Sequence, residues 1–362
     1  MVGPLRVGVI GMNPNGGWAR DSHVPALSAL PGLELAAVAG RNQDAADAAA
    51  RAFGVAKAYG SVEALCRDPD IDVITVAATL PSHRELLRPV LEAGRHVYCE
   101  YPLGLDAAES ASLADAARKA GGHAAIGLQA RQNPAVRRAR ELLDAGAVGR
   151  VLTARILSTT AGFGPAVDPA FAYTEEPENG VTVVSIQAAH TIDLAVALLG
   201  GLAGFDALAG TQYPEVRIGD GPPRQRRTHD HLLLQCRLST GGTLAVEVVG
   251  GRPAPTPFRF EITGEDGTLL LQGGAPRGFQ SGRLRLSVNG ADQAVDEERL
   301  SGLPDPALNV AATYAALCRD IERGETTTPG FDHAVRLARL IEDAVAASRT
   351  GRRAGGGDWP AA

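Results

Sequence analysis

The chain begins with Leu5-Arg6-Val7-Gly8-Val9-Ile10, followed at once by Gly11-Met12-Asn13-Pro14-Asn15-Gly16-Gly17-Trp18. A short apolar run with β-branched residues predicts a buried strand, and the glycine-rich turn after it is typical of a dinucleotide-binding Rossmann fold. Gly11 and Gly16 occupy the outer positions of the GxGxxG pattern, and Asn13 occupies the middle one. Asparagine tolerates left-handed backbone better than most residues. We expect this turn to hold a pyrophosphate, with an ordinary loop as the alternative.

After this first strand and turn, predicted strands and helices alternate as far as residue 127. Short apolar runs predict strands at Leu5–Ile10, Leu33–Ala39, Val73–Ala77 and His96–Cys99. Alanine-rich stretches between them predict helices at Asp44–Phe53, His83–Ala93 and Asp106–Ala120. Repeated βαβ units indicate a doubly wound parallel sheet, so residues 1–127 are predicted to form a dinucleotide-binding Rossmann domain.

A different pattern follows Gly127. An amphipathic helix is expected at Pro134–Ala145 and an apolar one at Val183–Leu199. Hairpin-like strands are expected at Val151–Ser158, Leu232–Leu238, Thr243–Val249, Arg259–Thr263 and Thr268–Leu271. Two helices close the chain, one capped by Asp305 and one running from Asp332 to Ser348. Residues 128–348 therefore predict an α+β substrate and oligomerisation domain with a largely antiparallel, open-faced sheet, and residues 349–362 a disordered tail.

Composition limits the classes of partner. The 362 residues carry a net charge of −6, so we expect no nucleic acid and no anionic membrane as partner. The sequence contains no run of about 18 or more uncharged apolar residues, so we expect no transmembrane helix. The start of the chain leads into a strand rather than a signal peptide, and four widely spaced cysteines predict free thiols and a cytoplasmic location. The basic run of Arg224, Arg226 and Arg227 is expected to be a solvated loop.

The end of the second predicted strand bears on the choice of cofactor. It continues as Gly40-Arg41-Asn42. Rossmann domains that select NAD place Asp or Glu here to bind the ribose 2′-hydroxyl, whereas arginine suits a 2′-phosphate. Gly40 has no carboxylate and Arg41 is a permanently charged donor. We therefore expect NADP rather than NAD, with a surface arginine as the alternative.

Further motifs resemble those of the glucose–fructose oxidoreductase, inositol dehydrogenase and MocA (Gfo/Idh/MocA) family over nearly the whole chain. They are Ile71–Val76 followed by Pro81-Ser82-His83, then Gly94–Leu103, and then Ala145–Arg150. A closer similarity is to a subgroup that includes the fungal repressor of the galactose regulon, which shares Gly17-Trp18-Ala19 and His23-Val24-Pro25-Ala26. The turn, Arg41 and this resemblance together give the expected cofactor residues: Gly11, Asn13, Gly16, Gly17, Trp18, Arg41, Asn42, Pro81, His83, Glu100 and Gln129.

The proton-handling positions depart from the family pattern. The family's E-K-P lysine is replaced by Tyr101, and the aspartate four residues before the motif histidine is replaced by Ile186. His190 remains, and a histidine titrates near neutrality without adjustment. We expect His190 to act as acid/base and Tyr101 to hold the substrate oxygen, although Tyr101 could equally be a packing aromatic.

Four more residues are expected to contact the substrate: Arg131, Gln187, Asp193 and Tyr173. A structural salt bridge is an equal alternative for Arg131. His229 and His231 flank Asp230, but no metal is expected there. The prediction is an NADP(H)-dependent oxidoreductase for a small sugar- or cyclitol-like substrate, forming a homodimer or homotetramer as the resemblance implies. A catalytically silent NADP-binding regulator is the main alternative, and a hydrolase or lyase a third.

Overall fold

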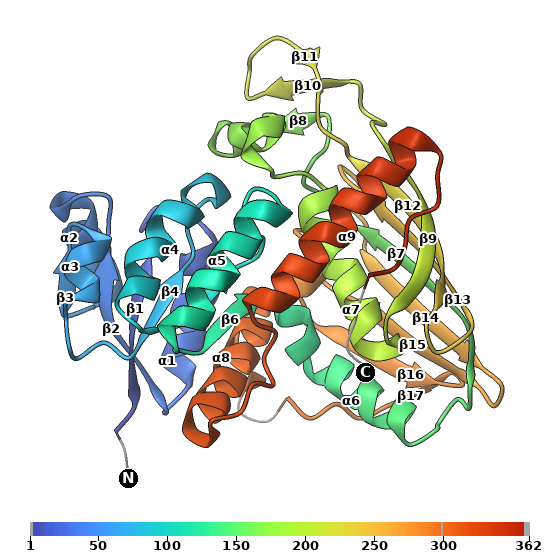
Figure 1. Cartoon of the computed structure of the whole chain (residues 1–362), viewed down its shortest axis with the longest axis horizontal. Helices are drawn as coiled ribbons and strands as arrows, with labels where there is room; N and C mark the ends of the chain where they lie inside the picture. Colours follow the sequence, from blue (N-terminus) through green and yellow to red (C-terminus); the bar gives the residue numbers. More distant parts are fainter. Residues whose placement is uncertain (1–2, 298–299, 358–362) are drawn as a thin grey trace. The chain divides into compact units, whose positions relative to one another are not determined.

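A computed structural model of the chain describes residues 3–297 and 300–357. The chain divides into two compact units, the first made of Met1–Gln129 and Glu298–Val335 and the second of Ala130–Glu297 and Arg336–Ala362. Figure 1 labels the elements of both units.

The first unit contains a six-stranded parallel sheet with the strand order β3-β2-β1-β4-β5-β6. The strands are β1 (Leu5–Ile10), β2 (Leu33–Ala39), β3 (Lys57–Tyr59), β4 (Val73–Val76), β5 (His96–Glu100) and β6 (Ala124–Gly127). Because β2 and β4 lie on opposite sides of β1, the carboxyl end of β1 is the topological switch point at which such sheets bind ligands. The doubly wound fold predicted from the sequence is confirmed.

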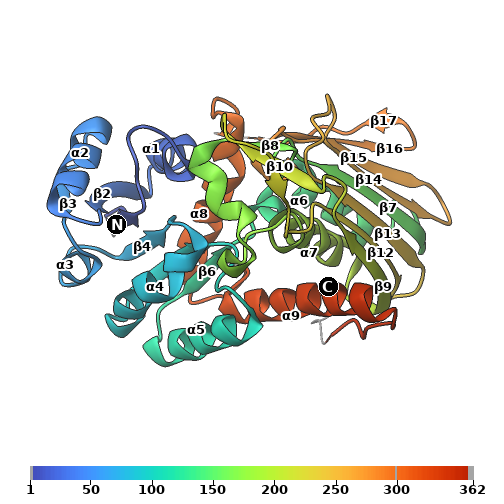
Figure 2. The same cartoon turned by 90° about the horizontal axis from the view of Figure 1, so that it is seen from above.

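The helices of this unit include the three predicted between its strands, each within one residue of the predicted ends. The helices are η1 (Ala19–His23), α1 (Val24–Ala29), α2 (Gln43–Phe53), α3 (Val62–Cys66), η2 (Leu80–Ser82), α4 (His83–Glu92), α5 (Ala107–Ala120) and α8 (Asp305–Arg323). The side chain of Asp106 accepts the Glu109 amide at the start of α5, and Gly121 ends that helix with a left-handed φ of 78°. Figure 2 shows the same elements from a second direction.

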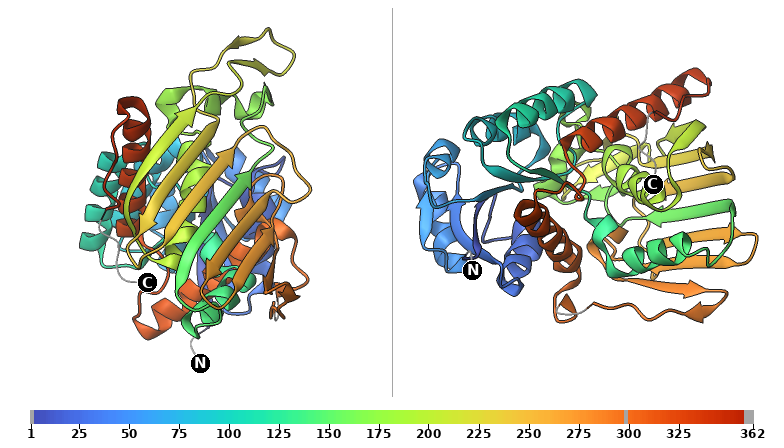
Figure 3. Two further views of the ribbon diagram at one scale, coloured as in Figure 1. Left: turned by 90° about the vertical axis from the view of Figure 1, so that its right-hand side faces the viewer. Right: turned by 60° about the horizontal axis from the view of Figure 1, so that its bottom comes forward.

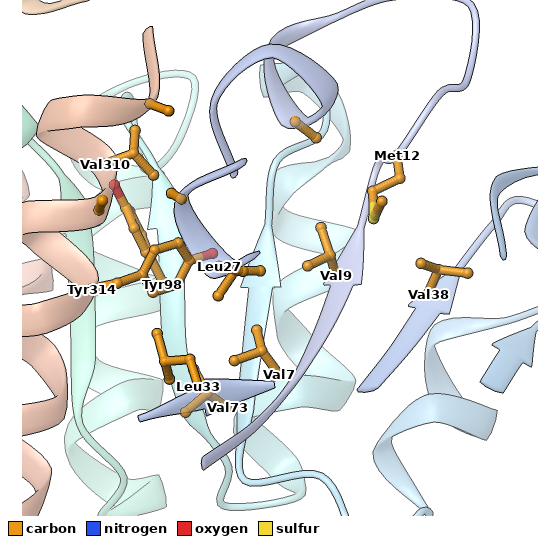
Figure 4. Close-up of a cluster of buried hydrophobic side chains, with 14 of the residues drawn as sticks. Val7, Val9, Met12, Leu27, Leu33, Val38, Val73, Tyr98, Val310 and Tyr314 are labelled. Carbon is orange, nitrogen blue, oxygen red and sulfur yellow. The ribbon is translucent and has the colours of Figure 1, made fainter. Parts of the chain in front are cut away.

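α8 belongs to the first unit although its sequence lies near the end of the chain. Its apolar residues Val310, Tyr314 and Leu317 are buried in one cluster with Val7 and other strand residues of the sheet (Figure 4). The sequence division placed residues 298–335 in the second domain, and the structure returns them to the first because this apolar face completes its core. The helix also starts differently from the prediction, since Pro304 is the N-cap and Asp305 the first helical residue.

The second unit contains an eight-stranded sheet with the order β17-β16-β15-β14-β7-β13-β12-β9. Its strands are β7 (Val151–Thr159), β9 (Leu202–Gly210), β12 (His231–Leu238), β13 (Thr243–Val249), β14 (Phe258–Gly264), β15 (Thr268–Gly273), β16 (Leu284–Val288) and β17 (Ala291–Asp292). All neighbours pair antiparallel except β7 with β13. The predicted, largely antiparallel sheet is confirmed, but its strands β9, β16 and β17 were missed.

One face of this sheet is covered by helices of the same unit. They are α6 (Pro134–Asp144) and the π-helical turn η6 (Val184–Ala188) continued by α7 (Ala189–Leu199). Along β12 the buried residues alternate with the exposed Leu233, Gln235 and Arg237, which lie on the other face. The left view of Figure 3 shows the strands in front and the helices behind them. The second face is therefore open within the unit.

Shorter elements complete the second unit. A three-stranded sheet is formed by β8 (Ala166–Val167), β10 (Glu215–Ile218) and β11 (Arg224–Gln225). The single turns are η3 (Gln129–Gln132), η4 (Pro169–Glu175), η5 (Pro177–Asn179) and η7 (Phe279–Ser281). The last helix, α9 (Phe331–Thr350), contains the unit boundary at residue 335.

Part of the tail that was predicted to be disordered is ordered. After α9, Ala354 forms a pair of backbone hydrogen bonds with Phe205 on β9, of 2.9 and 3.0 Å. Arg353 pairs with Asp206 on the same strand. The backbone amide and carbonyl of Ala354 are thereby satisfied by the edge strand of the sheet. The last five residues, 358–362, lie outside the described residues.

Among the described residues, Pro177–Leu199 is long and apolar enough to cross a membrane, although the sequence predicted no such segment. The structure buries 78% of its most apolar 18-residue window. Buried core helices of soluble proteins meet the same criterion, so the finding is weak evidence for a membrane span.

Candidate functional site

The turn after β1 has the backbone that a phosphate-binding turn requires. Gly11 adopts a φ of 94°, and an added Cβ would lie 2.6 Å from the carbonyl oxygen of Ala77, the residue after β4. Only glycine therefore allows the ends of β1 and β4 to approach so closely. Gly17 has a φ of 113° with no atom within 4 Å of an added Cβ, so this side of the turn is open.

Asn13, which replaces the middle glycine of the motif, is exposed and stabilises the turn itself. Its Oδ1 accepts the amide of Asn15 at 3.0 Å, and its backbone carbonyl accepts the amide of Gly16 at 3.3 Å. This local turn is one that asparagine favours. The departure from GxGxxG is therefore accommodated within the loop.

Two side chains predicted to bind the cofactor carry buried polar atoms without a hydrogen-bond partner among the described residues. One is the Nε1 of Trp18, directly after the glycine turn, and the other is the Oε1 of Gln129, just beyond β6. A buried polar atom without a partner costs free energy. Together with the cradle at Gly11, these two atoms fit a polar ligand at the carboxyl edge of the first sheet.

At the end of β2, the residues 40–42 have three different roles. An added Cβ on Gly40 would lie 2.7 Å from the amide nitrogen of Ala46 in α2, so no side chain fits there. Asn42, predicted to bind the cofactor, is the N-cap of α2, and its Oδ1 accepts the Ala45 amide at 2.9 Å. Arg41 is exposed to solvent.

The loop after β4 contains Pro81 and His83. Pro81 lies in the short turn η2, whereas His83 begins α4 and is 1% exposed. The Nε2 of His83 lies 3.1 Å from the Ala78 carbonyl oxygen and its Nδ1 3.6 Å from the Cys99 sulfur. Burial lowers the pKa of His83, which favours the neutral ring. In this structure His83 therefore holds the loop, and Pro81 is the nearer of the two to solvent.

Glu100 and Tyr101 follow each other at the end of β5. The side chain of Glu100 is 15% exposed, and its Oε1 lies 3.0 Å from the Nε2 of His23. Tyr101 is buried at 8% exposure, and its bond to Pro102 is cis. Behind Glu100, the Nδ1 of His23 lies 2.8 Å from the hydroxyl of Tyr314. Tyr314 was not predicted from the sequence, because nothing in its local pattern distinguishes it from other apolar positions of α8.

In the second unit, His190 and Gln187 lie one helical turn apart at the junction of η6 and α7. Both are buried, at 4% and 1% exposure. The Nε2 of Gln187 donates to the Ser158 hydroxyl at 2.9 Å. Ile186, at the position where the family has aspartate, offers no polar atom. His190 and Gln187 therefore share a helical face, as the three-residue spacing predicts.

Arg131 and Asp193, both predicted to contact substrate, bond to each other. The Nε and Nη2 of Arg131 donate to the two carboxylate oxygens of Asp193 at 2.8 and 2.7 Å. The side chain of Asp193 is 1% exposed and that of Arg131 22%. The salt bridge considered as an alternative for Arg131 is thus present, and Arg131 keeps some exposed surface.

The basic run that was expected to be a solvated loop contains a buried arginine. Arg226 has no exposed side-chain surface and pairs with Glu175 at 2.9 Å and with Asp230 at 3.0 Å. It also donates to the carbonyl oxygens of Phe163 and Gly164. The prediction was wrong for Arg226 because paired carboxylates and carbonyls replace water around it. Arg224 and Arg227, on either side, are exposed as expected.

Arg226 thereby fixes the loop that contains Tyr173. This loop runs through η4, and burial raises the pKa of Tyr173. The backbone carbonyl of Tyr173 accepts a hydrogen bond from the side-chain amide of Asn179 at 2.8 Å.

Among the residues that the structure describes, no group of three His, Cys, Asp or Glu side chains is placed to hold a metal ion. The Nε2 of His231 lies 3.2 Å from the Oε1 of Glu247.

Comparisons with known proteins identify families that match both parts of the chain. Residues 5–128 match the model of the oxidoreductase family with an NAD-binding Rossmann fold, and residues 134–273 match the Gal80p C-terminal domain. The dehydrogenase aclE of Aspergillus oryzae is 26% identical over 96% of this chain and 97% of its own length. The levoglucosan dehydrogenase of Pseudarthrobacter phenanthrenivorans is 26% identical over 95% of this chain and 96% of its own.

Regulatory proteins are among the relatives as well. The galactose/lactose metabolism regulatory protein GAL80 of Saccharomyces cerevisiae is 28% identical over 75% of this chain and 67% of its own length. A crystal structure of a super-repressor mutant of Gal80p from that yeast superposes with a TM-score of 0.87, covering 97% of this chain and 98% of that one at 24% identity. The chain belongs to the Gfo/Idh/MocA oxidoreductase family and lies close to the Gal80 proteins within it.

Proposed function

We propose that the chain is an NADP(H)-dependent oxidoreductase that acts on a small polyhydroxylated compound, such as a sugar or a cyclitol. The observation that carries this proposal is the edge of the first sheet, where Gly11 forms a cradle and Trp18 and Gln129 present unpartnered buried polar atoms. Relatives over nearly the whole chain include two named as dehydrogenases, one of them for levoglucosan, an anhydrosugar.

The preference for NADP rests on the end of β2. The carboxylate with which NAD-selective domains bind the 2′-hydroxyl is absent, and the approach of Ala46 leaves no room for any side chain at Gly40. Arg41 is exposed beside it and offers a planar, permanently charged group to a 2′-phosphate. Glu100, Gln129, Trp18 and Pro81 would hold the remaining parts of the dinucleotide.

The bound dinucleotide supplies hydride transfer, so the protein must orient the substrate and handle one proton. His190 is our candidate for the acid/base, since an imidazole accepts or donates a proton near neutral pH. Gln187 on the same helical face offers an amide to a hydroxyl group. Tyr101, where relatives of the family have lysine, would hold the substrate oxygen through its phenol.

The test combines binding and turnover. Purified protein is mixed with NADPH and a panel of keto-sugars, inosose-like ketones and imines, and the absorbance of the reduced cofactor is followed. We expect turnover that falls by about two to four orders of magnitude in His190→Ala. His123→Ala, at the amino end of β6, is the matched control and should leave the rate unchanged.

A regulatory protein is the second candidate. It is favoured by the Gal80p-like second domain and by Tyr101 and Ile186 at the proton-handling positions. Tight NADP binding without turnover on any compound of the panel would decide for this candidate. Activity that appears only in Tyr101→Lys would further identify the tyrosine as the residue that ended catalysis.

We also propose that the chain forms a homodimer or homotetramer through the open face of the second sheet. Leu208 on β9 and Leu233 on β12 are paired neighbours on this face, with exposed fractions of 57% and 40%. Light scattering should show an oligomer that dissociates in the Leu208→Lys, Leu233→Lys double variant.

We further propose a cytoplasmic location, which the four free cysteines support.

A further inference from the structure

A series of hydrogen bonds leads from the interior of the first unit to Glu100. The Oγ1 of Thr75 lies 2.7 Å from the Oη of Tyr314, which lies 2.8 Å from the Nδ1 of His23, whose Nε2 lies 3.0 Å from the Oε1 of Glu100. Thr75, His23 and Tyr314 are at most 1% exposed. Glu100 is the residue of this series that reaches the surface of the unit.

The chemistry of the four groups fixes the direction of the hydrogen bonds. An ionised carboxylate only accepts, so the Nε2 of His23 donates to Glu100. In a neutral imidazole the Nδ1 then accepts, so the Tyr314 hydroxyl donates to it and the Thr75 hydroxyl donates to Tyr314. If the ring were protonated, Glu100 would still be held through Nε2. These hydrogen bonds therefore fix the tautomer of His23. One carboxylate oxygen of Glu100 accepts the hydrogen bond from His23.

The four groups come from elements that are distant in the sequence. Thr75 lies in β4, His23 ends η1, Glu100 ends β5 and Tyr314 lies in α8. The ring of Tyr98 packs edge-on against His23 and Tyr314, with centroid distances of 5.3 and 4.9 Å, which restricts both rings. Figure 4 shows Tyr98 and Tyr314 side by side between the strands and α8. A residue that is held from so many elements is well suited to orient another one.

The position of Glu100 indicates which part of a dinucleotide it meets. β5 lies beyond β4, on the side of the switch point opposite to β2. Because the adenine ribose lies at the end of β2 in this fold, the nicotinamide half lies toward β4 and β5. We propose that His23 and Tyr314 are positioning residues that hold the Glu100 carboxylate toward the nicotinamide half of the cofactor. This inference rests on the proposed function, since it needs a bound dinucleotide.

The test compares two ligands by calorimetric titration, NADPH and adenosine 2′,5′-bisphosphate, which lacks the nicotinamide half. Tyr314→Phe removes one hydroxyl and keeps the ring. We expect it to weaken NADPH binding by up to about tenfold, the range of one hydrogen bond between neutral groups, and to leave binding of the fragment unchanged. Tyr213→Phe is the matched control, because it removes a hydroxyl that donates to the Gly251 carbonyl in the second unit. Equal losses for both ligands would show a merely structural role and overturn the inference.

A double-mutant cycle makes the test independent of small losses in stability. Glu100→Gln alone should weaken NADPH binding, and adding Tyr314→Phe should weaken it no further, because both act through the same carboxylate. Additive losses would contradict the inference. His23→Gln keeps a donor toward Glu100 and should retain more affinity for NADPH than His23→Leu, which also serves if Tyr314→Phe does not fold. No NADPH binding by the unaltered chain would overturn this inference and the proposed function together, whereas normal binding by every variant would overturn the inference alone.

Discussion

Arg131 and Asp193 form an ion pair with two parallel hydrogen bonds of 2.8 and 2.7 Å, in which Asp193 is buried and Arg131 retains 22% of its side-chain exposure. Arg131 belongs to η3 and Asp193 to the middle of α7, one turn after His190. The pair therefore fixes the start of the second unit to the helix that carries the candidate acid/base. Arg131 and Asp193 were predicted as separate substrate contacts, and in this structure they are bonded to each other.

The first prediction concerns this pair. Arg131→Met leaves the buried Asp193 carboxylate without its charged partner, which should lower the free energy of unfolding by about 2 kcal/mol, less than for a fully buried pair because Arg131 is partly exposed. Urea denaturation measures the change. Arg138→Met, which breaks an exposed pair with Glu141, is the control and should change it by less than about 1 kcal/mol. A loss no larger than that of the control would show that the pair does not stabilise the fold.

The second prediction concerns Arg41. Arg41→Ala should weaken NADP binding by about tenfold or more and leave NAD binding nearly unchanged, because only NADP carries the 2′-phosphate. Calorimetric titration with both cofactors measures this ratio. Arg51→Ala removes another exposed arginine, in the last turn of α2, and should affect neither cofactor. Equal losses for NADP and NAD would refute the assignment of Arg41.

The third prediction tests why β2 ends without an acidic residue. Gly40→Asp should not create NAD selectivity, because its Cβ would lie 2.7 Å from the Ala46 amide and displace α2. We expect a loss of about 1–3 kcal/mol in the free energy of unfolding, the usual cost of overpacking. Gly32→Asp is a matched control, since no atom lies within 4 Å of an added Cβ there. A stable Gly40→Asp variant with tight NAD binding would contradict the steric argument.

The fourth prediction concerns Arg226, which lies between two buried carboxylates. Arg226→Met leaves Glu175 and Asp230 without a positive partner and should cost about 3–5 kcal/mol of stability. Because Arg226 also bonds to the backbone at Phe163 and Gly164, proteolysis should cut the loop around Tyr173 faster in the variant. Arg227→Met, which breaks only exposed pairs, serves as the comparison. Unchanged proteolysis would show that Arg226 does not hold the loop.

The fifth prediction concerns the pH dependence of stability. Burial opposes the ionisation of Asp68, but hydrogen bonds from Lys57 and Tyr59 outweigh it and lower the pKa of Asp68 to about 2. The unfolded chain takes up this proton first as the pH falls, so the contribution of Asp68 is present above about pH 4 and is lost toward pH 2. Thermal unfolding of Asp68→Asn, measured between pH 2 and 6, should depend on pH less steeply than that of the unaltered chain. An unchanged slope would contradict this role.

The sequence by itself determined the elements whose signals are local. The run Leu5–Ile10 with the glycine turn after it specifies the first βα unit, because strand propensity and positive φ at glycine are properties of neighbouring residues. The Asp106 cap of α5 and the strands from β12 to β15 were likewise predictable. β9 was missed because its glycines and alanines have low strand propensity, and pairing with β12 makes it a strand.

Only the tertiary structure decided which side chains meet. The sequence could not distinguish Arg226 from its exposed neighbours. Its burial requires two carboxylates, and although Asp230 is close in the sequence, Glu175 lies about fifty residues earlier. Nor could the sequence place Tyr314 behind His23, because a helix more than 290 residues further along returns to the first sheet. Patterns along the chain encode local conformation, whereas burial and hydrogen bonding between distant residues depend on how the whole chain packs.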